Sequence, residues 1–514
     1  MIAGLLLAAV GLTGLDGRPD SIVDLRTTEG ARLLGATWKF APASIVPIDF
    51  RAPGADLKPT GRPIKTFDLV PRAGGATFDD ASWETVDPGA LEGRRTNGKL
   101  AFGWYRLNLT IPGQLGGFDT TGTTAVLEVV VDDYAEIWVD GALPVVLGGG
   151  GGTVRGYNTP QRVIVGRDVK PGQTVTVAIL GINGPLSDLP SNYVWIRSAT
   201  LDFYKSQRIE DAHRAGGTIE RLDPALEAII PAGAQIEQLA SGFQFTEGPA
   251  WHPDGYLLFS DPNANTIYRL TEDGDLSVYR TKSGYTGTDI AAYGQPGSNG
   301  LALDREGRLT IDEHGNRRVT RLERNGTLTV LADRYEGKRL NSPNDLVYRS
   351  DGALYFTDPP FGLPKFFDDP RKELKFSGVY LLKDGVLTLL ARELTGPNGL
   401  AFSPDEKFLY VDNWDEKKKV VMRYPVRPDG TVGEGTVFFD MKDAPEPEAL
   451  DGLKVDPAGN LFVSGPGGVW ILSPEGKHLG TIKAPELPAN FAFGGKDRKT
   501  LYMTARTSVY RIKL

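Results

Sequence analysis

Apolar and polar positions in the C-terminal half of the chain follow a phrase that returns six times. Each copy begins with a residue whose side chain carries an oxygen, continues as a short apolar strand, and returns through a tight turn as a second apolar strand. The copies begin at Glu247, Asn299, Asn344, Asn398, Asp451 and Asn490. Short strands joined by hairpin turns at a period of about 50 residues are typical of propellers, so we predict a six-bladed β-propeller over residues 236–514. The segment 236–240 is expected to complete the last blade.

Residues 21–204 follow a different pattern of short alternating strands separated by turns rich in glycine, proline and aspartate. The runs 104–111, 125–131 and 174–180 are examples. This pattern predicts an all-β fold in which a β-sandwich precedes the propeller. Residues 205–235 are mixed and charged, with prolines at 224 and 231, and we expect a linker with some helix there.

The order of phrases in the sandwich resembles a known domain. The phrases are FDDASW at 78–83, GWYR at 103–106, EIWVDG at 136–141 and KPGQT at 170–174. Together they resemble the galactose-binding-like jelly roll at the front of family-two glycoside hydrolases. That resemblance implies an accessory domain and a possible glycan contact through it.

Composition narrows the classes of partner and of chemistry. The net charge of −8 and the lack of a basic stripe argue against nucleic acid as a partner. The chain has no cysteine, which excludes disulfides, thiol nucleophiles and thiolate zinc sites. Of its four histidines, only His314 stands in a segment with other chemistry-bearing residues.

The N-terminal segment is apolar from residue 2 to residue 15. It is too short for a stable membrane span and is similar to the apolar part of a secretory signal, although a basic start is missing. We expect residues 1–20 to be a signal peptide and the protein to be exported to the periplasm or beyond the cell. A cytoplasmic location is the alternative if this segment is not a signal.

Strand geometry predicts where the site lies. The oxygen residue opens the first strand of each copy, and the loop after the second strand returns to the same face. That face therefore also collects Asp312, His314, Asp358 and Asp412. Two long loops, 283–298 and 361–377, are placed to form walls and a lid over it.

Six in-phase oxygen residues on a ring would converge on one axis. Two of the six carry charge, and the other four offer neutral carbonyl oxygens. All-oxygen ligation suits calcium, with magnesium, manganese or zinc as alternatives. The competing interpretation is that asparagine and aspartate before glycine only form turns at strand entrances.

The repeat also resembles the family of gluconolactonases, senescence marker protein and luciferin-regenerating enzyme. The matching motifs are TEGPAW at 246–251, GSNGL at 297–301, EHGNRRV at 313–319, NSPND at 341–345, FTDPPFG at 356–362, GPNGL at 396–400, DGL at 451–453 and NFAFGG at 490–495. The resemblance implies a six-bladed propeller with a catalytic divalent cation that opens sugar lactones by hydrolysis. It implies Glu247, Asn398 and Asp451 as metal ligands, and Asn344 as a contact to substrate or metal-bound water. This chain differs from members with an Asn-Asp-Gly phrase, because Leu346 follows Asp345.

Roles for the other residues follow from the chemistry of ester opening. Asp451 is expected to take the proton of the attacking water, with His314 as an alternative base or proton donor, or only as a loop support. Asn299, Asn344 and Asn341 are expected to bind substrate, and Asp358 to contact or orient it. We therefore predict a metal-dependent lactonase. The alternatives are a phosphotriesterase on the same metal site and a non-catalytic carbohydrate-binding protein.

Overall fold

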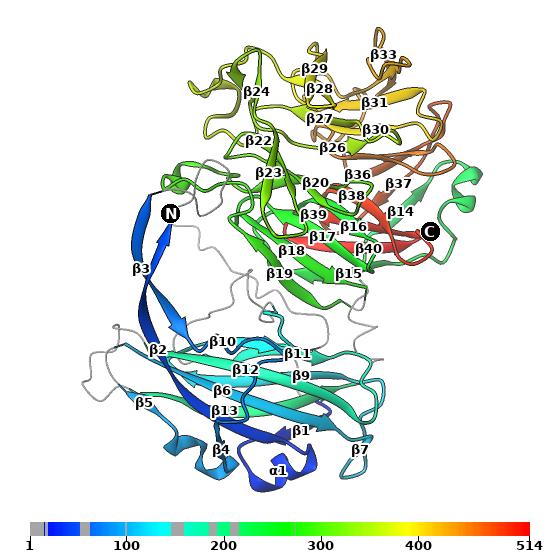
Figure 1. Ribbon diagram of the computed structural model, residues 1–514. Helices are drawn as coiled ribbons and strands as arrows, with labels where there is room; N and C mark the ends of the chain where they lie inside the picture. The colour runs from blue at the N-terminus through cyan, green and yellow to red at the C-terminus, as the bar shows by residue number, and fades with distance from the viewer. Residues whose placement is uncertain are drawn as a thin grey trace, which may run out of the picture. The chain divides into compact units, whose positions relative to one another are not determined.

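The computed structural model describes Leu15 and residues 19–51, 62–97, 100–144, 159–183, 193–205, 215–272 and 274–514. Almost all of its regular structure is β-strand (Figure 1), so the predicted all-β class is confirmed. The helical segments are α1 (Thr28–Leu33) and the 3-10 turns η1 (Pro88–Gly93), η2 (Pro224–Ala228), η3 (Ile290–Ala292) and η4 (Phe366–Asp368). Two compact units divide the chain, one mainly from residues 1–213 and the other mainly from residues 214–514.

The N-terminal unit consists of two antiparallel sheets. The first has the order β1 (Ser21–Asp24), β13 (Tyr193–Tyr204), β9 (Thr124–Asp132) and β11 (Gln161–Gly166), with β5 (Thr96–Asn97) paired to β13. The second has the order β10 (Tyr134–Val139), β12 (Gln173–Asn183), β6 (Ala101–Ile111), β2 (Thr37–Arg51) and β3 (Pro63–Val70), with β4 (Glu84–Val86) paired to β2. A separate hairpin joins β7 (Gln114–Leu115) to β8 (Phe118–Asp119).

One apolar core is shared by these two sheets. Leu127 of β9 and Leu107 of β6 both belong to it and are fully buried. Alternate residues of β11 are buried, as the period of two in a half-exposed strand requires. The unit is therefore a β-sandwich, while its likeness to a galactose-binding jelly roll stays a prediction.

The C-terminal unit, drawn from green to red in Figure 1, contains six antiparallel sheets among its described residues. Sheets one to three are β16 (Glu247–His252), β17 (Tyr256–Asp261), β18 (Thr266–Thr271), β19 (Leu276–Thr281); β20 (Ser298–Leu303), β21 (Leu309–Glu313), β22 (Arg318–Leu322), β23 (Leu328–Ala332); and β26 (Leu346–Tyr348), β27 (Leu354–Asp358), β28 (Gly378–Lys383), β29 (Val386–Ala391). Sheets four to six are β30 (Pro397–Phe402), β31 (Phe408–Asn413), β32 (Val420–Pro425), β33 (Thr436–Asp440); β34 (Leu453–Val455), β35 (Leu461–Gly465), β36 (Gly468–Leu472), β37 (His478–Lys483), β14 (Thr218–Arg221); and β38 (Pro488–Gly494), β39 (Thr500–Ala505), β40 (Ser508–Lys513), β15 (Ile236–Ser241). A further hairpin joins β24 (Arg334–Tyr335) to β25 (Lys338–Arg339).

The first strands of these sheets contact one another in chain order, from β16 through β20, β26, β30 and β34 to β38, and β38 contacts β16 again. This closed ring of inner strands is the arrangement of a propeller. Its closure depends on β15, which pairs with β40 as the sequence predicted for residues 236–240. The residues that open the inner strands therefore face a common axis.

The expected linker before the propeller is shorter than predicted. Residues 218–221 form β14, which pairs with β37 as a fifth strand, and η2 follows it. Leu226 and Ile230 are fully buried in the core of the propeller unit. The 3-10 turn η2 agrees with the helix expected in this segment. The strand β14 was not expected, because its few apolar residues stand among charged ones and show no clear period. Residues 206–214 lie outside the described residues.

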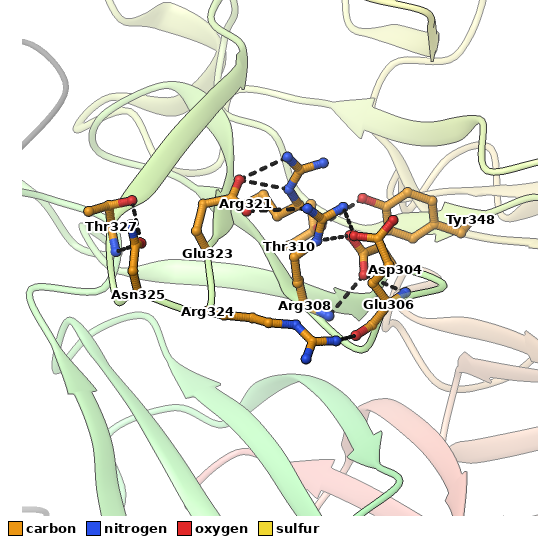
Figure 2. Close-up of polar contacts among 10 residues, drawn as sticks. All are labelled: Asp304, Glu306, Arg308, Thr310, Arg321, Glu323, Arg324, Asn325, Thr327 and Tyr348. Carbon is orange, nitrogen blue, oxygen red and sulfur yellow. Dashed lines mark hydrogen bonds and ion pairs between the residues drawn. The ribbon is translucent and has the colours of Figure 1, made fainter.

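At the ends of the blades that carry the tight turns, polar side chains form hydrogen bonds and ion pairs with one another, as the second sheet illustrates (Figure 2). The Asp304 carboxylate accepts the backbone N–H of Arg308 at 2.8 Å and its Nε at 2.7 Å. Arg308 also lies 3.3 Å from Glu323. Thr310 Oγ1 lies 2.7 Å from the hydroxyl of Tyr348, which joins the second sheet to the third. Polar groups at this end hold turns and neighbouring sheets together.

The predicted signal segment, apart from Leu15, Pro19 and Asp20, lies outside the described residues, so export stays a prediction. Within the part of the chain that the structure describes, none of the helices has the length and apolar character needed to cross a membrane.

Candidate active site

Five of the six oxygen residues that open the repeats line one cavity of about 440 Å³. They are Glu247, Asn299, Asn344, Asn398 and Asp451. The first four are almost completely buried, with at most 4% of each residue exposed. Each stands at or just before the start of an inner strand, and the closed ring of strands brings them together. The sixth, Asn490, is buried but does not line this cavity.

Hydrogen bonds join three of these side chains across neighbouring sheets. Asn344 Nδ2 donates to Asn398 Oδ1 at 2.6 Å. Asn398 Nδ2 donates to Asp451 Oδ1 at 2.8 Å. The third, fourth and fifth sheets therefore present their oxygen residues as one connected row.

Glu247 and Asp451 are the two charged members of the repeat, and both line the cavity. Burial raises the pKa of Glu247 well above its usual range, and the charge of Asp451 raises it further. Burial also raises the pKa of Asp451 to about 7, against hydrogen bonds from Glu247 and Asn398 that lower it. Two carboxyl groups that share one cavity, and whose charges disfavour each other, are stabilised by a proton or a cation.

Asp345 is a buried carboxylate that the sequence analysis did not select. Its Oδ2 accepts a hydrogen bond from Lys454 Nζ at 3.0 Å and lies 3.3 Å from Asn490 Nδ2. Asn490 Nδ2 also lies 3.3 Å from Glu247 Oε2. Asp345 of the third sheet thus contacts the fifth and sixth sheets and supports the position of Glu247.

His314 lies behind Asn344 and does not line the cavity. Its Nε2 is 3.1 Å from Asn344 Oδ1, and the residue is wholly buried. Because Asn344 Nδ2 already donates to Asn398, the consistent assignment has His314 Nε2–H donating to Asn344 Oδ1. Burial lowers the pKa of His314 to about 4, although its hydrogen bonds oppose this. The sequence left open a base, a proton donor or a loop support, and the structure places the His314 ring against the side chain of Asn344 instead.

Asn341 and Asp358 do not line the cavity, and the substrate contact predicted for them does not fit their placement. The Asp358 carboxylate accepts the backbone N–H groups of Asn341 and Ser342 at 2.8 and 2.7 Å. The Asn341 amide donates to the backbone oxygens of Asp358 and Phe376 at 2.9 and 2.8 Å. Burial raises the pKa of Asp358 to about 8, while the two backbone N–H groups oppose the rise.

A carboxylate that accepts backbone N–H groups also occurs in the first sheet. Asp261 stands at the end of the second strand and accepts the backbone N–H groups of Gln244 and Ala264 at 2.8 and 3.0 Å. A carboxylate at this position shapes the loop that follows the strand by satisfying its backbone donors. The sequence pattern alone does not distinguish this role from substrate binding.

Three residues that line the cavity each have a buried side-chain oxygen with no hydrogen-bond partner among the described residues. These oxygens are Asn299 Oδ1, Asn263 Oδ1 and Glu448 Oε2. Sequence reasoning missed Asn263 and Glu448 because neither stands at a repeated position. Buried acceptors without donors are rare in folded proteins, so the cavity suits a ligand that brings hydroxyl groups or a cation.

The two loops expected to wall the site contact each other. The guanidinium of Arg371 in the loop 361–377 lies 5.0 Å from the centre of the Tyr293 ring in the loop 283–298. Arg371 Nη1 also donates to the Tyr293 hydroxyl at 3.1 Å. Phe361 and Gln295, one from each loop, line the cavity.

The side chains that line the cavity offer oxygen atoms as ligands for a metal ion. Among the residues with described positions, no group of three or more carboxylate, imidazole or thiolate side chains is arranged to hold one. Glu247 and Asp451 supply two carboxylates, and the other available donors are amide oxygens such as those of Asn398 and Asn299. This mixture fits a hard cation that completes its shell with water, and it does not fit a thiophilic metal.

Comparisons with known proteins agree with this arrangement. The family profile described as SMP-30/Gluconolactonase/LRE-like region matches residues 245–507, which include every oxygen residue of the repeats. A gluconolactonase of Zymomonas mobilis is 38% identical over 309 residues, covering 58% of this chain and 86% of the relative. A lactonohydrolase of Aspergillus oryzae is 27% identical over 213 residues, covering 37% of this chain and 48% of that protein.

Among solved structures, a gluconolactonase of Xanthomonas campestris matches with 33% identity and a TM-score of 0.50. The match covers 58% of this chain and 94% of that one. The profile spans more than half of the chain and contains all five oxygen residues that line the cavity. The chain belongs to the SMP-30/gluconolactonase/LRE-like family.

Proposed function

We propose that this protein hydrolyses a sugar lactone with the help of one divalent cation held by Glu247, Asn398 and Asp451. The observation that carries the proposal is that Glu247, Asn398 and Asp451 line one cavity, where Asn398 Nδ2 donates a 2.8 Å hydrogen bond to Asp451 Oδ1. The names of the relatives from Zymomonas mobilis and Xanthomonas campestris support the reaction class. Calcium is the cation that the all-oxygen donor set favours.

Such a cation, when bound, polarises the lactone carbonyl and makes a water molecule more acidic. The chain's own residues orient the reactants. Asn299 Oδ1, buried without a partner among the described residues, is available to accept a hydrogen bond from a substrate hydroxyl. Asn344 Nδ2 carries a second hydrogen besides the one given to Asn398, and this hydrogen can reach the oxyanion that develops on the carbonyl.

Proton transfer is assigned to Asp451. Its Oδ1 accepts the Asn398 amide, which leaves Oδ2 as the atom to receive the proton of the attacking water. The new C–O bond forms at the carbonyl carbon, the bond from that carbon to the ring oxygen breaks, and the proton passes to the leaving oxygen. One water is consumed, and a carboxylic acid with a free hydroxyl results. His314 does not transfer this proton in our proposal, but holds Asn344 Oδ1.

The experiment compares ester classes in one assay. Purified protein with added calcium is given a panel of sugar δ-lactones and γ-lactones and a phosphotriester, and acid release is followed with a pH indicator. We expect turnover of at least one sugar lactone and slower turnover of the phosphotriester. Glu247→Gln serves as the control for the site, with circular dichroism as the control for the fold. If the phosphotriester is the better substrate, or if no lactone is opened, the proposal is wrong.

A further inference from the structure

We infer that the outer part of the cavity is a subsite for a second, neutral sugar ring, so that the substrate is the lactone of a disaccharide acid. This inference rests on the proposed lactone hydrolysis and names its substrate class more closely. The cavity has a polar floor and a set of aromatic residues around it. The floor is made by the five oxygen residues Glu247, Asn299, Asn344, Asn398 and Asp451. The aromatic residues that line the cavity are Phe245, Phe361, Phe366 and Trp414.

Exposure separates the two parts. Asn299, Asn344 and Asn398 of the floor are at most 4% exposed, whereas Trp414 is 40% and Phe366 44% exposed. The floor therefore lies deep, and the aromatic part reaches the surface. The volume of about 440 Å³ falls in the range that holds drug-sized ligands, which are larger than a single six-membered lactone. A lactone ring on the floor would leave the aromatic part uncovered.

Trp414 is held in place as a platform. Its ring packs against Phe361, with 5.1 Å between ring centres and 62° between planes. Phe361 is in turn packed edge-on against Phe367. The backbone N–H of Trp414 donates to Gly396 O at 2.7 Å. A fixed, exposed indole suits the face of a pyranose ring that carries C–H bonds, because such a contact buries apolar area with little loss of side-chain freedom.

Hydrogen-bond acceptors in the same cavity argue against a purely apolar occupant. Glu448 Oε2 and Asn263 Oδ1 are buried and have no partner among the described residues. The hydroxyl groups of a sugar would supply the donors that these oxygens need. An alkyl group on the aromatic platform would leave both acceptors unpaired, at a cost in binding free energy.

Charge argues against an anionic second group. Glu416 and Glu448 both line the cavity, and Arg506 is the cationic side chain among its described lining residues. The Arg506 guanidinium lies over the ring of Phe245, 6.0 Å from its centre. A phosphate or sulfonate beside Glu416 and Glu448 would meet like charges, whereas a neutral ring would not. The aromatic platform, the free acceptors and the carboxylates together favour a glycosyl group.

The test measures kcat/KM of the full-length, calcium-loaded protein on three lactones: glucono-δ-lactone, the δ-lactone of cellobionic acid, and an alkyl δ-lactone such as δ-decanolactone. We expect the cellobionic lactone to be preferred over glucono-δ-lactone by about tenfold, the size of one aromatic stacking contact. Trp414→Ala should abolish most of that preference, and Trp414→Phe should keep part of it. Lys417→Ala, an exposed neighbour outside the cavity, is the matched control and should keep the wild-type ratio.

A second variant separates sugar from hydrocarbon recognition. Glu448→Leu should lower kcat/KM for the cellobionic lactone and raise it for the alkyl lactone. Quenching of tryptophan fluorescence by cellobionate, lost in Trp414→Phe, gives a readout that does not depend on turnover. An unchanged ratio in Trp414→Ala, or an equal loss for the alkyl lactone, would overturn the inference while lactone hydrolysis stands. Absence of turnover on all three lactones would overturn both proposals.

Discussion

The side-chain amide of Asn398 donates a 2.8 Å hydrogen bond to Oδ1 of Asp451, and these residues stand at the entrances of the fourth and fifth sheets. A hydrogen bond between the heads of two repeats fixes both side chains relative to the ring axis. Because Asp451 lines the same cavity as Glu247, the bond orients one of the two carboxyl groups on which the proposed cation site depends.

Removing the unpartnered acceptor of Asn299 should affect substrate binding and leave the fold intact. We expect Asn299→Ala to raise KM by about tenfold, since one hydrogen bond to a substrate hydroxyl is worth about 1.5 kcal/mol. Its free energy of unfolding should change by less than about 1 kcal/mol, because Asn299 Oδ1 has no partner among the described residues. Steady-state kinetics and urea unfolding measure the two effects separately. A wild-type KM would contradict the assignment.

Asp358→Ala should give the opposite result. The substitution leaves the backbone N–H groups of Asn341 and Ser342 without acceptors in a buried place. We expect the free energy of unfolding to fall by roughly 2–6 kcal/mol, on the basis of about 1–3 kcal/mol for each unpaired buried group. KM at a temperature where the variant remains folded should stay within about threefold of wild type. A large rise in KM without loss of stability would restore the substrate contact that the sequence suggested.

His314 should make stability depend on pH in the acid range. Burial lowers its pKa to about 4, below the value near 6.5 of the unfolded chain. The unfolded state therefore binds the proton more readily, and the stability that the neutral ring contributes is present above about pH 6.5 and lost as the pH falls towards 4. The loss is on the order of 3 kcal/mol.

The matched variant for this effect is His314→Gln, which keeps a donor towards Asn344 and does not titrate. Urea unfolding of both proteins at pH 7, 5 and 4 gives the difference between them, so that carboxyl groups common to both cancel. The wild type should lose stability relative to His314→Gln as the pH falls. A constant difference across this range would show that His314 is not held neutral.

The Asp345–Lys454 pair should behave as a coupled unit. Asp345 is almost completely buried, and Lys454 is only partly exposed. Lys454→Met leaves the carboxylate without its cation, and we expect a loss of about 2–3 kcal/mol in the free energy of unfolding, less than for a fully buried pair. The double variant Asp345→Asn, Lys454→Met should recover much of that loss. A double-mutant cycle with no coupling would contradict the pairing.

The repeat predicted more of the site than of its surroundings. Residues in the same phase of a closed ring must approach the axis, so Glu247, Asn299, Asn344, Asn398 and Asp451 could be placed in one cavity from their spacing. Asn490 has the same position in its repeat, but its side-chain amide hydrogen-bonds Asp345 and Glu247 and the residue does not line the cavity. The spacing of the repeats predicts the position of a residue in the ring, but it does not predict which neighbour its side chain hydrogen-bonds.

Contacts between residues of distant sheets could not be predicted from the sequence. Lys454 and Asp345 are 109 positions apart, and nothing in either phrase marks them as partners. Asp358 was assigned to substrate because a carboxylate after a strand looks the same whether it faces a ligand or the backbone of its own loop. The strand β14 was missed for a related reason, because its partner β37 lies more than 250 residues further along the chain.

The cation is the central claim, and calcium binding measured together with activity tests it most directly. Protein treated with chelator and then dialysed is titrated with calcium by calorimetry, while acid release from a sugar lactone is followed at each step. We predict one calcium per chain, activity that rises in proportion to occupancy, and loss of both in Glu247→Gln, by at least about a hundredfold in kcat/KM. Full activity in the chelated protein, or calcium binding that survives Glu247→Gln unchanged, would contradict the account.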